Sequence, residues 1–351
     1  MPRTSSFETT SHDTPFPPPP EVRSPVPELL RIALLGTKHA HAAGKVDVLK
    51  ASGDWTLVGT FEPDEAARRE HERQSAYEGV PWLTKEEILG DPEVVAVAVE
   101  GEVGENLPLA HEAIAAGKHV HLDKPPGADL AEFIGLAQRA VERGLLIQQG
   151  YMFRYNPAFR FVFGASENGW LGRIFFVRVR MSTRIGGEQR GQLSAYAGGM
   201  MFELGCHVLD AVVRLLGAPT EVQGFCRHDA PAADALADNT LAVFQFPGAM
   251  AVVESAAMEI EPFPRRRFEV YGTEGSIVIE PLEPPAVTVS LASPPEGHPV
   301  GWHSVDLPPY TRYVDDFREL ADCLRSGKPL PYSPAHDVEV QRALLAACGM
   351  V

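Results

Sequence analysis

A regular alternation of apolar runs and helical stretches over residues 31–150 constrains the fold of this chain most strongly. The runs are short and rich in valine, isoleucine and leucine, and stretches with helical periodicity separate them. Such alternation is typical of a parallel sheet with right-handed crossovers, whose ligands bind at the carboxyl ends of the strands. The predicted strands are 31–36, 55–62, 94–100, 119–123 and 145–150, and the predicted helices are 40–51, 66–76, 85–89, 107–116 and 130–143.

The first predicted strand leads into a glycine turn, and the second ends in an acidic residue. This order is typical of a dinucleotide-binding unit, in which the pyrophosphate rests on a helix N-terminus and the carboxylate binds the ribose. We therefore predict Gly36, Lys38, His39 and Glu62 as cofactor-binding residues, with Glu62 favouring NAD and NADP as the second option. Lys38 and His41 replace the second and third glycines of the usual turn. Lys38 must swing aside, where it could pair with phosphate, and a domain that has lost its nucleotide stays an alternative.

Two groups of histidines invite comparison with zinc sites. His39 and His41 lie in the turn, whereas His119, His121 and Asp123 alternate onto one face of a predicted strand. Zinc takes four ligands, and neither group supplies a complete set. We therefore predict no metal site.

The stretch 198–217, GGMMFELGCHVLDAVVRLLG, has an uninterrupted helical pattern bounded by glycine. At about 100° per residue, Glu203, His207, Asp210 and Arg214 share one face, while the other faces are apolar. A histidine on such an edge could accept a proton near neutral pH, and a carboxylate one turn earlier could orient its ring. The alternative is a set of ordinary charge pairs on a solvated face.

Lys124 stands where a predicted parallel strand ends, the edge at which ligands of such sheets bind. Proline follows it, and a cis peptide bond there could direct the lysine side chain. Lys124 is therefore a candidate site residue. The alternative is an exposed lysine in a loop.

Composition limits the partners and the compartment. The 351 residues are enough for two domains, and the formal charge of −16 argues against nucleic acid or an anionic membrane as a partner. The four cysteines are widely spaced and indicate no disulfide framework, which fits a reducing cytoplasm. Residues 1–27 are rich in proline and polar residues, so we expect a disordered tail and no signal peptide.

Several segments in order resemble the Gfo/Idh/MocA oxidoreductase family, which includes glucose-fructose oxidoreductase and inositol dehydrogenase. They are DPEVVAVAV, AIAAGKHVHLDKP, GYMFRYNPAF, GGMMFELGCHVLD, DNTLAVFQFPGAMAVVESA and YGTEGSIVI. The resemblance implies an α/β protein with a Rossmann NAD(P)-binding domain over residues 28–150. It implies a second domain over 151–351, with an open, mostly antiparallel sheet that serves substrate binding and assembly into a dimer or tetramer.

The resemblance also assigns roles to individual residues. It implies that Lys124, His207 and Glu203 are catalytic, with Lys124 also close to the cofactor. Arg154, Asn156 and Asp210 match positions that often contact substrate. Asn156 precedes a proline and suits a helix start, and we favour a structural role for Asn156 and also for Arg154. Asp210 could simply pair with Arg214 or anchor the helix.

The implied activity is hydride transfer between a nicotinamide and a carbinol or carbonyl carbon of a sugar, polyol or related small molecule. The segment EGEVGEN, residues 100–106, departs from the family pattern, and its three glutamates suit a pyrophosphate poorly. Two alternatives therefore remain. One is a ligand-sensing, regulatory protein of the same fold, and the other is an NAD-dependent glycosidase.

Overall fold

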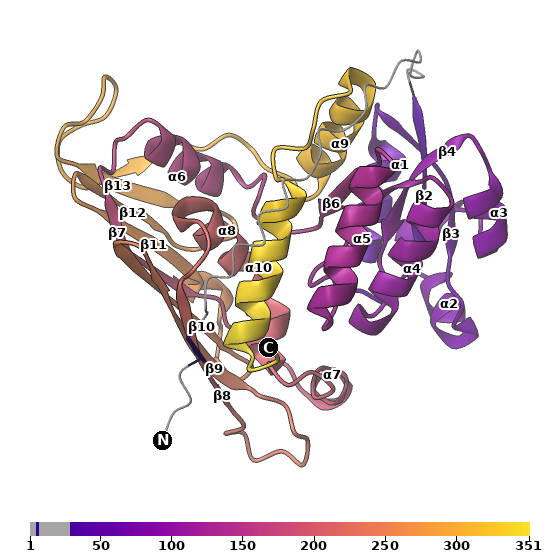
Figure 1. The fold of residues 1–351 in the computed structure, drawn as a ribbon, viewed down its shortest axis with the longest axis horizontal. Helices are drawn as coiled ribbons and strands as arrows, with labels where there is room; N and C mark the ends of the chain where they lie inside the picture. Colours follow the sequence, from indigo (N-terminus) through magenta and orange to yellow (C-terminus); the bar gives the residue numbers. More distant parts are fainter. Residues whose placement is uncertain (1–4, 7–28) are drawn as a thin grey trace. The chain divides into compact units, whose positions relative to one another are not determined.

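The computed structural model of this chain describes residues 5–6 and 29–351 (Figure 1). The described chain divides into two compact units. Residues 29–150 and 311–338 form the N-terminal unit, and residues 5–6, 151–310 and 339–351 form the C-terminal unit. The tail expected over residues 1–27 lies outside the described residues apart from β1 (Ser5–Ser6), a two-residue strand.

A five-stranded parallel sheet forms the centre of the N-terminal unit, in the order β3-β2-β4-β5-β6 (Figure 1). The strands are β2 (Leu30–Leu35), β3 (Trp55–Phe61), β4 (Val94–Val99), β5 (His119–Leu122) and β6 (Ile147–Gln149). The helices are α1 (Ala42–Ala51), α2 (Glu65–His71), α3 (Lys85–Gly90), α4 (Val103–Ala115), α5 (Leu130–Glu142) and α9 (Val314–Ser326), with a short 3₁₀ turn at Ser75–Tyr77. The predicted parallel α/β arrangement is confirmed.

Alternate residues of the strands pack into two separate hydrophobic cores, one on each face of the sheet. Ile32 and Leu34 of β2 pack in a cluster with α1 and α9, whereas Ala33 and Leu35 pack in a cluster with α3, α4 and α5. This two-sided burial explains why the strands read as continuous apolar runs. The helix layer containing α1 is completed by α9, where the indole nitrogen of Trp55 donates to the Phe317 carbonyl at 2.8 Å. Residues 311–338 therefore belong to the N-terminal unit, although the sequence assigned them to the second domain.

The C-terminal unit is built on a nine-stranded sheet in the order β1-β8-β9-β10-β7-β11-β12-β13-β14 (Figure 1). All neighbours pair antiparallel except β10 and β7, as the prediction of a mostly antiparallel sheet required. The strands are β7 (Ile174–Arg180), β8 (Glu221–Arg227), β9 (Asn239–Phe246), β10 (Ala249–Ala256), β11 (Arg267–Gly272), β12 (Gly275–Ile279), β13 (Val287–Leu291) and β14 (His303–Val305).

Three helices accompany this sheet: α6 (Pro157–Glu167), α7 (Gly187–Leu193) and α8 (Cys206–Leu216). The ring of Phe159 on α6 meets Phe268 of β11 edge to face, with the ring centroids 5.0 Å apart. A further 3₁₀ turn lies at Phe263–Arg265, and α10 (Pro334–Ala347) carries residues of both units. Every helix among residues 29–351 is too short or too polar to cross a bilayer.

Candidate active site

The glycine turn after β2 closes tightly against the loop that follows β4. Gly36 has φ +86°, a conformation that favours glycine, and a Cβ atom there would lie 2.6 Å from the backbone nitrogen of Gly101. No side chain fits between these two loops. The first glycine of the predicted fingerprint is thus required by the backbone itself.

Glu62 follows β3 and is held against the glycine turn. Its Oε2 atom accepts from the Thr37 backbone nitrogen at 2.9 Å and from the Thr37 hydroxyl at 2.8 Å, while Oε1 accepts from the Asp64 backbone nitrogen at 3.0 Å. Only 6% of Glu62 is exposed. The carboxylate is therefore fixed in position at the end of the second strand, where a dinucleotide fold presents its ribose ligand.

Lys38 pairs with carboxylates of this chain. Its Nζ lies 2.9 Å from Glu105 Oε1 and 3.7 Å from Asp64 Oδ2. Burial alone would lower the pKa of Lys38, but Glu105 raises it above its ordinary value. The side chain swings aside as expected. Its partner Glu105 is one of the glutamates in the unusual segment 100–106. Lys38 therefore offsets the negative charge of one of these glutamates.

A buried ion cluster lies where β4 and β5 end. Lys45 on α1 places its Nζ 2.5 Å from Glu100 Oε1 and 2.7 Å from Asp123 Oδ1, and none of the three side chains is exposed. Burial raises the pKa of Glu100 to about 7, against the lowering effect of Lys45. Burial alone would lower the pKa of Lys45, but Asp123 and Glu100 raise it above its usual value. Tyr313 covers the lysine, with its ring centroid 5.5 Å from Nζ.

The two histidines of the turn converge on the same carboxylate. His39 Nδ1 lies 2.9 Å from Asp123 Oδ2, and His41 Nδ1 lies 3.0 Å from Asp123 Oδ1. Burial lowers the pKa of His41 to about 3, so its imidazole is neutral at pH 7. Burial alone would raise the pKa of Asp123, but His39, Lys45 and His41 hold it well below its usual range. Asp123 is therefore an ionised acceptor for several groups at once.

His119 and His121, the second group of histidines, do not form a metal site with Asp123. His119 Nδ1 accepts from the Leu146 backbone nitrogen at 2.9 Å, and His121 Nδ1 lies 2.8 Å from Gln148 Oε1. Both rings are committed to the neighbouring strand β6 or the residue before it. Of the residues proposed for a strand-face site, the structure brings only Asp123 into a cluster of potential metal ligands.

Lys124 comes directly after Asp123 at the carboxyl end of β5. Its side chain is buried, with 1% of the residue exposed, and the Lys124–Pro125 peptide bond is cis, as the sequence had suggested. The alternative of an exposed loop lysine is therefore wrong. The ion cluster that fixes Asp123 also fixes the backbone that carries this lysine.

In the C-terminal unit, the helix expected over 198–217 is not uniform. Residues Met201–Gly205 form a π turn before α8 begins at Cys206. A π turn closes its hydrogen bonds between residues i and i+5, so the regular 100° spacing assumed for 198–217 does not hold across Glu203. His207 is 2% exposed, and its ring lies edge-on to Phe153 with the centroids 6.1 Å apart.

Asp210 of α8 pairs with Arg154. The guanidinium donates from Nη2 to Oδ1 at 2.7 Å and from Nε to Oδ2 at 3.1 Å, and both side chains are almost completely buried. Arg214, the partner that the sequence offered for Asp210, binds Glu167 at 2.5 Å. The structure thus joins two of the predicted substrate residues to each other.

Asn156 is the N-cap of α6, as the helix-start interpretation predicted. Its side-chain oxygen accepts from the Ala158 backbone nitrogen at 2.9 Å, and its amide nitrogen donates to the Leu282 carbonyl at 3.3 Å. Asn156 is fully buried. Its polar atoms are thereby used in fixing the start of the helix.

Sequence reasoning missed Lys45 and Thr37, and it did not place Glu100 and Asp123 together in one ion cluster. The sequence carried a signal for three of these residues. Glu100 and Asp123 directly follow apolar strands, and Lys45 falls on the side of α1 that buries Val46 and Leu49. A charged residue at such a position must find a partner in the interior.

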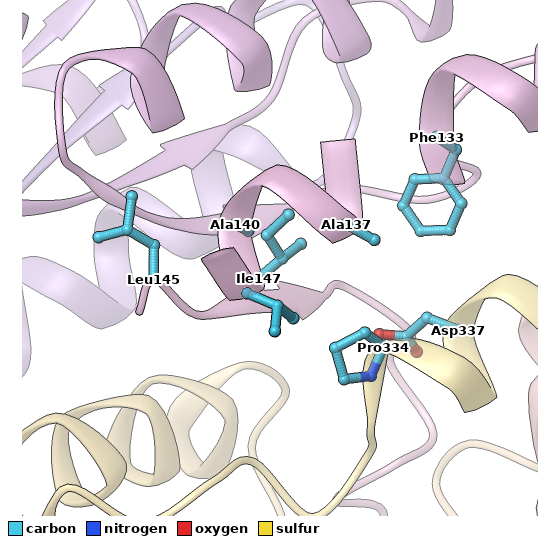
Figure 2. A pocket seen from close by; sticks show the side chains of 8 residues that line it. Phe133, Ala137, Ala140, Leu145, Ile147, Pro334 and Asp337 are labelled. Carbon is cyan, nitrogen blue, oxygen red and sulfur yellow. The ribbon is translucent and has the colours of Figure 1, made fainter. Parts of the chain in front are cut away.

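A small recess in the N-terminal unit lies beside α5 and β6 (Figure 2). Its lining is mostly apolar, with one carboxylate: Phe133, Ala137, Ala140, Val141, Leu145, Ile147, Pro334 and Asp337. Its cavity volume of about 10 Å³ is room for about one water molecule. It is too small for a nucleotide or a sugar.

These features define a class of protein: a two-unit enzyme that binds a dinucleotide on a parallel sheet and carries a second, antiparallel-sheet unit. Comparison with known families agrees. Residues 30–151 match the family described as "Oxidoreductase family, NAD-binding Rossmann fold", and residues 160–278 match "GFO/IDH/MocA C-terminal domain". The chain belongs to the Gfo/Idh/MocA family of oxidoreductases, so the predicted family, fold class and enzyme class are confirmed.

Individual relatives are distant. The chain is 28% identical over 254 residues to scyllo-inositol 2-dehydrogenase (NAD(+)) of Bacillus subtilis, covering 69% of this chain and 71% of the relative. It is 23% identical over 286 residues to the scyllo-inositol 2-dehydrogenase (NADP(+)) IolW of the same organism, covering 75% and 78%. Among solved structures, UDP-N-acetylglucosamine 3-dehydrogenase GnnA from Acidithiobacillus ferrooxidans aligns with a TM-score of 0.77 at 19% identity, covering 92% and 98%. The structural similarity to GnnA, at 19% identity, shows that the two chains share a fold.

The residues of the N-terminal unit fit a dinucleotide. The close approach of Gly36 to Gly101 and the fixed carboxylate of Glu62 are the backbone and side-chain features that such a ligand requires. Asn106 adds a third feature. It is completely buried, and within residues 5–6 and 29–351 neither atom of its amide has a hydrogen-bond partner, so it can still bond a ligand group near Gly101.

Proposed function

We propose that this enzyme reversibly oxidises a secondary hydroxyl group of a cyclic polyol, with an inositol or a related sugar as the substrate class. The observation that carries the proposal is the buried amine of Lys124, placed at the ligand-binding edge of a dinucleotide-binding sheet. The names of the inositol dehydrogenases among the relatives support the substrate class.

Residues of the N-terminal unit would hold the cofactor. Gly36 would form the tight turn that a dinucleotide fold needs after its first strand, and Glu62 would accept from a ribose hydroxyl. A negative carboxylate there would repel the 2′-phosphate of NADP, so NAD is the expected partner. A bound nicotinamide supplies the hydride acceptor in oxidation and the hydride donor in reduction.

Lys124 and His207 have separate roles in this proposal. Lys124 would donate a hydrogen bond to the substrate oxygen and stabilise its developing negative charge. His207 would accept the hydroxyl proton in oxidation and return it in reduction, which contributes about 10²- to 10⁴-fold to the rate. Glu203, in the π turn before His207, would orient the imidazole.

Arg154 and Asp210 would position His207. Because their charges pair with each other, they would not bind the substrate directly. Their buried, two-point ion pair ties α8 to the segment before α6. Asp210 lies one turn after His207 on α8, so the pair would hold the imidazole in place. Asn156 would act as a helix cap.

Assembly into a homo-oligomer is also part of the proposal. One face of the nine-stranded sheet carries Phe176, Met250 and Tyr271, and Met250 is 48% exposed. The ion pair between Arg178 and Glu254 lies on the same face. A second copy of the chain would cover these apolar groups, and light scattering on purified protein would give its mass.

The test starts from cofactor-free protein titrated calorimetrically with NADH and NADPH, followed by a screen of inositols and sugars at 340 nm. We expect micromolar NADH binding and turnover of at least one polyol. His207→Ala should lower kcat by about 10²-fold or more while NADH affinity stays within about threefold. Lys124→Met should lower kcat/KM, and Lys85→Met, on the surface of α3, serves as the control.

Three outcomes would overturn this proposal. Failure to bind either nucleotide would remove the redox step and favour the regulatory alternative. Net hydrolysis of a glycoside without accumulation of NADH would favour the glycosidase. Full activity of His207→Ala would refute the assignment of the acid/base group.

A further inference from the structure

We propose that His39, His41 and Asp123 form a binding site for one divalent transition-metal ion, with zinc as the reference ion. The inference goes beyond the proposed redox activity and does not depend on it. It concerns a cluster within the N-terminal unit to which the proposed redox chemistry gives no metal, although His39 was also predicted to contact the cofactor.

The three residues present their ligand atoms to a common point. One possible ligand atom from each residue, an imidazole nitrogen from each histidine and a carboxylate oxygen, lies within 4.8 Å of the other two. The nitrogens lie 2.9 Å and 3.0 Å from oxygens of Asp123. Around a tetrahedral zinc with bonds of about 2.0–2.1 Å, neighbouring ligand atoms are about 3.3 Å apart. Small outward movements would therefore admit the ion.

The ligand types select a class of metal. Two imidazole nitrogens and one carboxylate oxygen suit zinc and its neighbours in the first transition series, whereas calcium and magnesium prefer oxygen ligands alone. The side chains of His39 and His41 keep 11% and 12% exposure. Three protein ligands with an accessible side leave a fourth position for water or a substrate group.

The surroundings already hold the carboxylate in place. Lys45 donates to Asp123 and to Glu100 in a region with no exposed surface. The His39 backbone nitrogen also donates to the Glu100 carbonyl at 3.1 Å, which fixes the turn that carries both imidazoles. Such outer hydrogen bonds are typical supports of metal ligands.

The competing explanation is that the two imidazoles simply hydrogen-bond Asp123 through Nδ1, although His39 Nδ1 also accepts from the His41 backbone nitrogen at 3.3 Å. Both explanations fit the distances, but only one predicts that the protein takes up metal. A bound ion would join the glycine turn to the segment containing Lys124, and would therefore raise resistance to thermal unfolding by linkage.

The experiment uses the full chain, free of any histidine tag and treated with chelator. Zinc chloride is titrated calorimetrically, and cobalt chloride is titrated while visible d–d absorption is recorded. We expect one ion per chain with a dissociation constant in the micromolar range or below, and a higher Tm with zinc. His39→Gln and His41→Gln keep an amide that can bond Asp123 and should weaken binding by at least about tenfold. His111→Gln, on α4, is the matched control.

Wild-type protein that takes up no zinc or cobalt would overturn the proposal, as would uptake that both glutamine variants retain. Far-ultraviolet circular dichroism checks that each variant folds. Should a variant fail to fold, the wild type still decides. Zinc should protect His39 and His41, but not His111, from diethylpyrocarbonate in a mass-spectrometric map, and equal modification with and without zinc would refute the site.

Discussion

The ammonium group of Lys45 lies 2.7 Å from the carboxylate of Asp123, and neither side chain has any exposed surface. A helix of the first βα unit is thereby tied to the residue before Lys124, across 78 positions of sequence. A Cβ atom on Gly150 would lie 3.0 Å from the same carboxylate and 3.1 Å from the ammonium, so the chain after β6 also closes on this pair. The interior of the N-terminal unit is therefore organised around charge as well as apolar packing.

Lys45→Met should destabilise the protein by about 3–5 kcal/mol, because the substitution leaves Glu100 and Asp123 buried without their ammonium partner. Urea unfolding followed by circular dichroism measures the loss. The control is Lys85→Met, which breaks a surface pair with Glu112 and should cost less than about 1 kcal/mol. Similar losses for the two variants would contradict the importance of the buried cluster.

His121 should make stability depend on pH. Burial lowers its folded-state pKa to about 3, whereas the unfolded chain has the ordinary value near 6.5. Unfolding therefore takes up a proton between these values, and stability contributed by the neutral ring is lost as pH falls from about 6.5 toward 3. As the pH falls from about 6 to 4, the free energy of unfolding should decrease in wild type and in His121→Asn. We expect the decrease in His121→Asn to be smaller by about 1.4 kcal/mol per pH unit. If the free energies of unfolding of wild type and His121→Asn, each relative to its value at about pH 7.5, changed equally with pH, His121 would not be the cause of the pH dependence.

Local sequence patterns were sufficient for the sheet of the N-terminal unit. The runs at Leu30–Leu35 and Val94–Val99 are apolar on both faces because helices cover both, and glycine or a charged residue ends each of them. Gly36 and Glu62 could be placed for the same reason, since they stand directly at strand ends. The position of a residue relative to its own strand is a local property.

Features that depend on distant segments were not predictable. The return of α9 to the N-terminal unit rests on its packing against α1 and Trp55, which no local pattern encodes. The π turn at Met201–Gly205 interrupts a sequence with perfect α-helical periodicity. Asp210 pairs with Arg154, 56 positions away along the chain. For α9 and for Asp210, the contacting residue lies far along the chain.

Arg154→Met should destabilise the protein by about 3–5 kcal/mol, because the buried carboxylate of Asp210 would lose its guanidinium partner. Replacing both residues with apolar side chains should recover part of that loss, since no buried charge then remains. Chemical denaturation of the single and double variants measures the difference. The surface substitution Arg214→Met should cost less than about 1 kcal/mol. A double variant no more stable than the single one would argue against a simple ion pair.

Glu62→Gln should change cofactor choice more than it changes folding. Glutamine keeps an oxygen that can accept from Thr37, but it removes the charge that would repel a 2′-phosphate. We expect the preference for NADH over NADPH to narrow by about tenfold, equivalent to about 1.4 kcal/mol. Calorimetric titration of each nucleotide measures it, with Glu65→Gln, on exposed α2, as the control. If affinity for both nucleotides fell equally, Glu62 would act by shaping the Thr37 turn, and the charge would not be the determinant of selectivity.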